Sequence, residues 1–303
     1  MEGQPVISSS PQIHARGSTR SVMWWVIAAL IPAGVWSVVL FGLRPLLVIL
    51  TATAAAVACE ALLNALFKRP QTIGDLSAVV TGLLIAYNMP PHVPLFVPAA
   101  ASVFAIAVVK WSFGGLGANW MNPALAGRVF VFFSWGKAMT QWTFPRVPGA
   151  ADAVSGPTPL GSIIPGSLGE MSALLLIAGG LFLVILRIVD WEIPLAYLGS
   201  FAFLIWLFDG MQYGSGAFSG DVVFHLCSGG LMLGAWFMAT DMVTTPLTRR
   251  GRLIFGLGCG FFTFVIRRFG NLPEGVSLAI IFMNILTPLI DRHVTPKRYG
   301  VSK

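Results

Sequence analysis

Long uncharged apolar segments constrain the fold of this chain more than any other feature of its sequence. They recur from residue 22 to residue 291, and each approaches the ~20 residues that a membrane-spanning helix needs. Charged residues make up only 10% of the chain, whereas a soluble domain carries roughly 25%. The sequence therefore predicts an all-α polytopic membrane protein.

Ten segments are candidates for spanning helices. Two of them, 76–90 and 122–136, are short and are expected to be short or broken spans. The first 20 residues are polar, and the first apolar run is too long for a cleavable signal peptide. The full-length candidates are 22–42, 45–67, 93–111, 171–189, 193–209, 222–240, 253–269 and 274–291.

The two halves of the chain resemble each other at an offset of roughly 150 residues. The segment "LSAVVTGLLIAYNMPP" (76–91) is matched by "CSGGLMLGAWFMATDM" (227–242), and "NPALAGRVFVFF" (122–133) by "PEGVSLAIIFMN" (273–284). Five spans per half is an odd number, so the second half is expected to be inverted relative to the first. Such repeats indicate a central pathway at their interface. The alternative is two similar helix bundles without a pathway.

Basic residues predict the orientation, because Lys and Arg are enriched on the cytoplasmic side of membrane proteins. With both termini in the cytoplasm, most basic residues lie inside, and Arg267 and Arg268 are the main exceptions. The net charge of +7 is thus attributed to orientation, not to nucleic-acid binding. The expected organisation is a cytoplasmic tail (1–20), a first five-helix repeat (21–136), an outward-facing loop (137–170), a second repeat (171–291) and a cytoplasmic tail (292–303).

The loop at 137–170 contains "DAVSGPTPLG" (152–161), which lies outside the apolar segments. Its many Gly and Pro residues disfavour a helix or a central strand. Thr158 stands between two prolines, which bias its neighbours toward extended backbone and so present its hydroxyl group. Gly156 permits close approach of another group. From the residues alone, an ordinary Pro/Gly-rich turn is the alternative.

This motif resembles the flavin-attachment motif of the family that contains the D subunit of the Rnf electron-transport complex and the B subunit of the sodium-pumping NADH:quinone reductase. The family pattern is Asp-Gly-x-Ser-Gly-Ala-Thr. The stretches "FGLRPLLVIL" (41–50), "SAVVTGLLIAYNMPP" (77–91) and "FGGLGANWMNPALAGRVFVFFS" (113–134) also resemble that family. The resemblance covers essentially the whole chain.

The resemblance implies that a separate flavin transferase esterifies FMN to Thr158, within a surrounding motif of Asp152, Ser155 and Gly156. Two residues depart from the family pattern, Ala153 and Pro157. The resemblance also implies a noncovalent riboflavin, without identifying its site. Implied partners are the other Rnf membrane subunits, including a second covalent-flavin subunit, and the surrounding lipid of a bacterial or archaeal inner membrane. The couple of the whole complex would be ferredoxin and NAD.

The short N-terminal tail favours the Rnf D subunit over the reductase's B subunit, which carries a longer extension. We therefore expect a flavoprotein subunit of a redox-driven ion pump, a translocase that passes electrons between partners while sodium or protons are moved. A component like the reductase's B subunit is one alternative. A urea-transporter-like passive channel without flavin, or a scaffold subunit without a cofactor, would also fit the fold.

Glu60 lies inside the second apolar run, and intramembrane acidic residues are functional candidates. The alternative is an ion pair with Lys68 or Arg69, about two turns away.

Arg128 lies within a span and must face protein, water or an anion. Asp75 and Asp241 lie at the ends of the paired short segments, where they either cap or anchor helices or coordinate ions. His225 is expected to be a packed, hydrogen-bonded side chain. No metal site is expected, because the cysteines form no CxxC pair and fall in apolar runs, at Cys59, Cys227 and Cys259.

Overall fold

The computed structural model describes residues 18–141, 167–212, 216–270 and 275–295, and these ranges contain helices but no strands. The prediction of an all-α protein is confirmed for this part of the chain. The helices are α1 (Thr19–Phe41), α2 (Arg44–Leu66), η1 (Ile73–Asp75), α3 (Ser77–Tyr87), α4 (Phe96–Phe104), η2 (Ala105–Trp111), α5 (Pro123–Ser134), α6 (Gly136–Met139), η4 (Leu168–Glu170), α7 (Ala173–Ile185), α8 (Glu192–Gln212), α9 (Val222–Cys227), α10 (Leu231–Leu233), η5 (Gly234–Met238), α11 (Arg249–Phe269) and α12 (Val276–His293).

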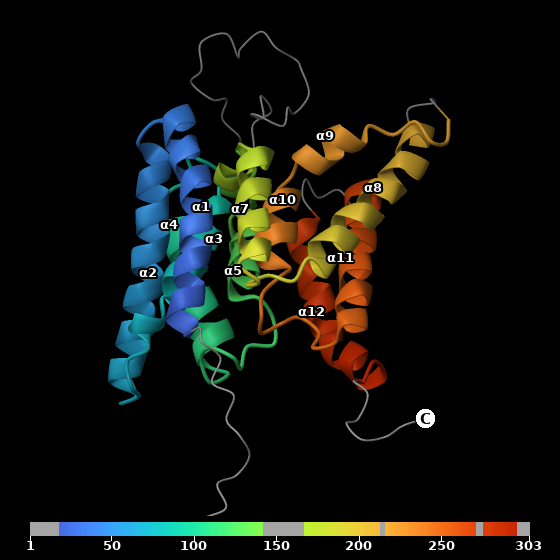
Figure 1. Ribbon diagram of the computed structural model, residues 1–303. Coiled ribbons are helices and arrows are strands. Elements are labelled where there is room, and N and C mark those ends of the chain that lie inside the picture. Colours follow the sequence, from blue (N-terminus) through green and yellow to red (C-terminus); the bar gives the residue numbers. More distant parts are fainter. Residues whose placement is uncertain (1–17, 142–166, 213–215, 271–274, 296–303) are drawn as a thin grey trace, which may run out of the picture.

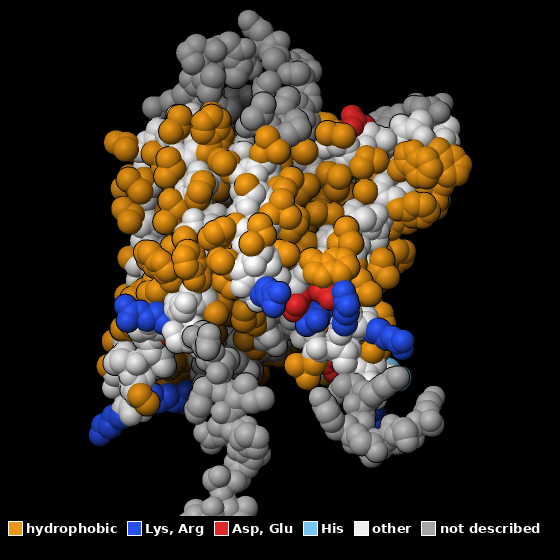
Figure 2. Space-filling view, viewed as in Figure 1, with side chains coloured by type: hydrophobic (Ala, Val, Ile, Leu, Met, Phe, Trp, Pro, Cys, Tyr) orange, Lys and Arg blue, Asp and Glu red, His pale blue; other side chains and the backbone are white. Residues whose placement is uncertain are grey.

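Four of the described helices are long and apolar enough to cross a membrane by themselves, namely α1, α2, α8 up to Gly210, and α12. Helices α3, α5 and α7 are shorter and apolar, as is α4 together with η2. Apolar side chains cover the middle of the molecule, and Lys and Arg side chains gather at its lower end (Figure 2). The chain is a multi-pass membrane protein.

Local chemistry explains where several helices begin. Ser18 precedes α1 and accepts a hydrogen bond from the backbone of Ser21, and Thr248 does the same for Gly251 in α11. A proline in the first turn starts α2 and α5, where its missing N–H is of no consequence. These capping groups satisfy backbone donors that have no partner within the helix.

The expected span at 222–240 is not one helix, which corrects the sequence-based prediction. It breaks between α9 and α10, where Gly229 and Gly230 have φ values of 69° and 67°. Arg267 of α11 donates hydrogen bonds to the carbonyl oxygens of His225, Ser228 and Gly229, at 2.9, 2.9 and 3.0 Å. Arg267 therefore binds the exposed carbonyl groups of the break, a role that its assignment to an outer segment did not anticipate.

The first half of the chain occupies one side of the molecule and the second half the other (Figure 1). They meet where α1 packs on α7 and α5 packs on α12. Polar contacts join them, because Asn88 Nδ2 lies 3.4 Å from Met238 Sδ and Arg128 Nη1 lies 2.7 Å from Ser277 Oγ. The members of these pairs are 150 and 149 residues apart. The start of α1 and the end of α12 lie at the same, lower end (Figure 1).

Helices α8 and α11 pack closely because α11 presents glycines to α8. A Cβ atom at Gly260 would lie 2.7 Å from the carbonyl oxygen of Tyr197, and one at Gly256 would lie 2.8 Å from that of Ile193. Small residues at such spacing let two backbones approach within a membrane, where dispersion contacts drive helix association.

Candidate functional site

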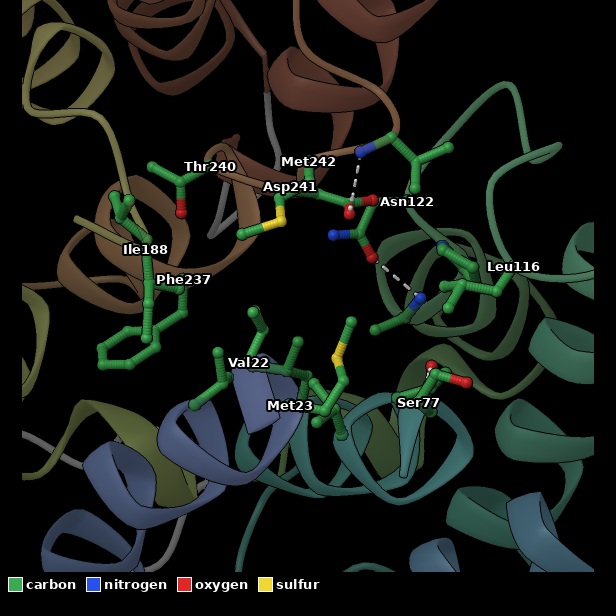
Figure 3. A pocket seen from close by; sticks show the side chains of 18 of the residues that line it. Val22, Met23, Ser77, Leu116, Asn122, Ile188, Phe237, Thr240, Asp241 and Met242 are labelled. Atoms are coloured by element: carbon green, nitrogen blue, oxygen red, sulfur yellow. Dashed lines mark hydrogen bonds between the residues drawn. The ribbon is translucent and has the colours of Figure 1, made fainter. Parts of the chain in front are cut away.

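A cavity opens between the two halves (Figure 3). It contains about 820 Å³ of empty space, part of it open to solvent. Its walls come from α1, α3, the start of α5, the end of α7 and the segment from η5 to Val243. In the close-up, Val22 and Met23 lie opposite Phe237 and Thr240. The cavity therefore lies where segments from both halves of the chain meet.

Asn122 holds the two halves together at this cavity. Its Oδ1 atom accepts hydrogen bonds from the backbone of Ala124 and Leu125, which caps α5. Its Nδ2 atom donates to the carbonyl oxygen of Met238, 3.1 Å away in the other half. Because Asn122 is only 4% exposed, neither partner has water as a ready substitute.

Asp241 follows η5 and faces the same cavity (Figure 3). Its carboxylate accepts hydrogen bonds from the backbone of Val243 at 3.4 Å and the hydroxyl group of Thr244 at 3.3 Å. Desolvation by the surrounding protein raises the pKa of Asp241, while the two hydrogen bonds oppose this shift. The structure thus assigns Asp241 a turn-stabilising contact, and its second predicted role, ion coordination, stays a prediction.

Two buried polar atoms in the cavity wall have no hydrogen-bond partner among the described residues. They are Oδ1 of Asn119, an acceptor, and Nε1 of Trp236, a donor. Unsatisfied polar atoms are uncommon in native structures and point to a bound molecule or water. The cavity wall therefore contains one unpaired acceptor and one unpaired donor, both buried within it.

Glu60 forms a buried ion pair with Lys110, which lies in the π-helical segment η2. The Lys110 Nζ atom is 3.0 Å from Glu60 Oε1 and 2.8 Å from Oε2, and both side chains are 4% exposed. The predicted alternative, a pair with Lys68 or Arg69, is wrong. Packing of α2 against η2 supplies a partner 50 residues away in sequence, so spacing along α2 could not identify it.

The ion pair belongs to a longer chain of polar groups. Lys110 also donates to Ser77 Oγ at 2.6 Å, and Ser77 donates from its hydroxyl and backbone N–H groups to Asp75. On the other side, Thr72 Oγ1 donates to Glu60 Oε1. Asp75 therefore anchors Ser77, the first residue of α3, and its other predicted role, ion coordination, stays a prediction.

Arg128 and His225 both make the protein contacts expected of them. Arg128 is 5% exposed and donates to Ser277, so it faces protein rather than lipid. His225 Nε2 lies 3.3 Å from Asp209 Oδ2. Neither residue lines the central cavity.

The motif residues Asp152, Ser155, Gly156 and Thr158 lie outside the described residues. The segment that follows them is anchored in the core. The Leu168 N–H donates to the carbonyl oxygen of Met89 at 3.0 Å, and the Ser37 hydroxyl group donates to the carbonyl oxygen of Leu168. Short helical turns, α6 and η4, also occupy the two ends of the expected loop at 137–170, which sequence reasoning treated as irregular throughout.

Sequence reasoning missed Lys110, Asn119 and Trp236 as site residues. Lys110 was counted only among the basic residues on the cytoplasmic side, yet it is 3% exposed. A signal was present, since Lys110 lies within the expected span at 93–111 and a buried lysine needs a partner. Nothing in the sequence distinguished Asn119 and Trp236 from other polar and aromatic residues.

Comparisons with known proteins show which family this chain belongs to. The model of the NQR2, RnfD, RnfE family matches residues 6–300. The D subunit of the proton-translocating ferredoxin:NAD(+) oxidoreductase complex of Clostridium ljungdahlii is 42% identical, over 98% of this chain and 96% of the relative. The D subunit of the Na(+)-translocating complex of Acetobacterium woodii is 42% identical over the same shares.

The D subunit of an ion-translocating oxidoreductase complex from Stutzerimonas stutzeri is 39% identical, over 94% of this chain and 93% of the relative. The match to the family model and the similarity to these relatives extend over nearly the whole chain. The chain therefore belongs to the NQR2, RnfD, RnfE family, and its relatives are Rnf-type D subunits of ion-translocating oxidoreductase complexes.

Proposed function

We propose that this protein is the D subunit of an ion-translocating ferredoxin:NAD oxidoreductase, in which it carries flavin and links electron transfer to cation movement. The observation that carries this proposal is the near full-length similarity to relatives with that name. Two relatives of equal identity are named for different ions, so similarity alone does not choose between sodium and protons. The proposed partners are the other Rnf membrane subunits, including a second covalent-flavin subunit.

Thr158 is the proposed attachment point for FMN, with Asp152, Ser155 and Gly156 as the motif that a flavin transferase recognises. The bound flavin supplies the electron-transfer chemistry, and the protein binds and orients it. The protein's contribution is to hold the loop, and the core contacts of Leu168 support this role.

The test for Thr158 is flavin fluorescence of the polypeptide in a denaturing gel. Wild type and Thr158→Ala are produced with a flavin transferase, and Gln141→Ala serves as a control outside the motif. We expect fluorescence in the wild type and control and none in Thr158→Ala. A dark wild-type band would mean that Pro157 prevents attachment, and it would favour the passive-channel or scaffold alternatives.

The proposed topology is ten spans in two inverted five-helix halves, with both termini in the cytoplasm and the flavin loop outside. Support comes from the paired contacts of α1 with α7 and α5 with α12, and from left-handed residues, Leu76 and Gly230, directly before α3 and α10. A membrane-impermeant thiol reagent tests it with single cysteines placed at Ser18 and Gln141 in a cysteine-free chain. Labelling from outside is expected at position 141 and not at position 18.

The central cavity is the proposed site of noncovalent riboflavin. Its mostly apolar walls, which include the Trp236 indole, suit a flat ring system, and the buried Trp236 N–H group has no hydrogen-bond partner among the described residues. Trp236→Phe removes the donor and keeps an aromatic ring. We expect less extractable riboflavin than in the wild type and in the control Trp206→Phe, which alters an exposed indole. Equal riboflavin in all three would exclude this site.

A further inference from the structure

Two basic residues follow α2 at the point where this helix leaves the membrane. Helix α2 has 23 residues, which extend about 34 Å at 1.5 Å per residue, whereas the hydrocarbon core of a bilayer is about 30 Å thick. The helix therefore ends at the level of the lipid headgroups. Lys68 and Arg69 come directly after it and are exposed. They lie at the lower end of the molecule, where α2 ends and Lys and Arg side chains gather (Figures 1 and 2).

The backbone at Lys68 has a conformation that favours glycine. Its φ value is 55°, in the left-handed region. Its N–H group donates to the carbonyl oxygen of Ala65 at 3.3 Å, and that of Arg69 donates to the carbonyl oxygen of Asn64 at 2.9 Å. This is the Schellman arrangement, in which glycine usually takes the left-handed position because it has no Cβ. A lysine in its place points to a function of the side chain, since strained residues cluster at functional sites.

The ring of Trp111 fixes the guanidinium group of Arg69. The Arg69 Cζ atom lies 4.3 Å from the ring centroid, within the range of a cation–π contact. The ring is itself held, because Trp111 Nε1 donates to Asn64 Oδ1 at 3.0 Å and Phe67 packs on it with 4.6 Å between ring centroids. A stacked guanidinium group keeps the N–H groups at its edge available, and such groups bind phosphate oxygens in pairs.

Neither of these two charges is neutralised within the part of the chain that the structure describes. No ion pair or side-chain hydrogen bond joins the Lys68 ammonium group or the Arg69 guanidinium group to another described residue. Glu60 lines a cavity beside Arg69, but its carboxylate is already paired with Lys110. The surface therefore has two positive charges that are available to an anion from outside the chain.

Apolar side chains cover the surface of α2 and its C-cap next to these charges. Leu62, Leu66 and Phe67 are all more than half exposed. A phospholipid has the same order of chemistry, with acyl chains on one side and a negatively charged phosphate group at the membrane surface. Anionic headgroups attract Lys and Arg residues that lie at this level. The end of α2 therefore matches an anionic phospholipid in charge, polarity and depth.

We propose that Lys68 and Arg69 form a binding site for the phosphate group of an anionic phospholipid, with Trp111 as the platform that orients Arg69. Arg69 binds two phosphate oxygens through its N–H groups, and Lys68 supplies the second positive charge. The acyl chains lie along the last turns of α2. Only ionic contacts and hydrogen bonds form. The inference is independent of the proposed function, because it requires only that α2 spans the membrane.

The test is native mass spectrometry of the purified full-length chain in a neutral detergent, titrated with phosphatidylglycerol. The variants are Arg69→Gln and Lys68→Gly. Arg250→Gln is the matched control, because Arg250 is an exposed arginine at the start of α11 and has no aromatic ring stacked on it among the described contacts. Phosphatidylcholine and inorganic phosphate are titrated in parallel. The concentration that half-saturates the first binding site is measured, together with the melting temperature of each variant.

We expect phosphatidylglycerol to half-saturate the wild type at a concentration about tenfold lower than phosphatidylcholine does. Arg69→Gln should raise the phosphatidylglycerol concentration about tenfold and Lys68→Gly about fivefold, whereas Arg250→Gln should change it less than about twofold. Lys68→Gly should keep or raise the melting temperature, because glycine adopts the left-handed backbone without strain. Its weaker lipid binding could then not be attributed to unfolding.

Equal half-saturating concentrations of the two lipids in the wild type would overturn the proposal. Equal losses in Arg69→Gln and Arg250→Gln would also overturn it, because net charge alone would then explain binding. Inorganic phosphate that binds as tightly as phosphatidylglycerol would assign the residues to a free anion instead of a lipid. Unchanged lipid binding in Arg69→Gln would leave this surface to another occupant, such as an acidic protein. A lower melting temperature in Lys68→Gly would assign Lys68 to stability and refute its role in the site.

Discussion

Asn122 provides a direct test of how the two halves are joined. The same side chain caps α5 through Oδ1 and donates across the interface to the carbonyl oxygen of Met238 through Nδ2. Substitutions can separate these two contacts. Asn122→Ala removes both, whereas Asn122→Ser keeps a capping hydroxyl group that is too short to reach Met238.

The magnitudes follow from the burial of the site. Loss of an N-cap costs about 1 kcal/mol, and a buried carbonyl group left without its donor costs about 1–3 kcal/mol. Hydrogen bonds between membrane helices contribute less on average, about 0.6 kcal/mol. We expect Asn122→Ala to lower the free energy of unfolding by about 2–3 kcal/mol and Asn122→Ser by about 1–2 kcal/mol.

The assay is reversible denaturant unfolding of the purified subunit in mixed micelles, followed by Trp fluorescence. Ser18→Ala is the matched control, because Ser18 caps an exposed helix start and makes no contact between halves. It is expected to cost at most about 1 kcal/mol. Asn122→Ser with wild-type stability would refute a stabilising bond to Met238, and Asn122→Ala equal to Ser18→Ala would refute any role beyond capping.

Two further predictions concern helix packing and the central cavity. Gly260→Ala is expected to lower the free energy of unfolding by about 1–3 kcal/mol, because its Cβ would meet the carbonyl oxygen of Tyr197. Gly199→Ala has open space and should be near neutral in the same unfolding assay, so equal effects would contradict the packing argument. The folded-state pKa of Asp241 is raised, so its ionisation costs stability as pH rises through the unfolded and then the folded pKa. Asp241→Asn should therefore raise the melting temperature more at a pH above the two pKa values of Asp241 than at a pH below them. A difference in melting temperature between variant and wild type that grows at acidic pH would contradict the prediction.

Local sequence information determined much of this fold. Uncharged apolar length identified helices such as α1 and α2 within a few residues, because a chain in lipid must satisfy its backbone hydrogen bonds internally. The Asn122–Pro123 pair marked the start of α5 for an equally local reason, since a cap and a proline act within one turn. The motif around Thr158 identified the family without any knowledge of packing.

Only the tertiary structure decided which distant residues meet. Glu60 pairs with Lys110 instead of its near neighbours because α2 packs along η2, and burial makes an unpaired charge there prohibitive. Arg267 likewise stabilises the break before α10, because its guanidinium group donates hydrogen bonds to carbonyl groups that lie about 40 residues earlier in the chain. Apolar periodicity reports the environment of a single helix, whereas ion pairs, helix breaks and cavities depend on contacts between helices.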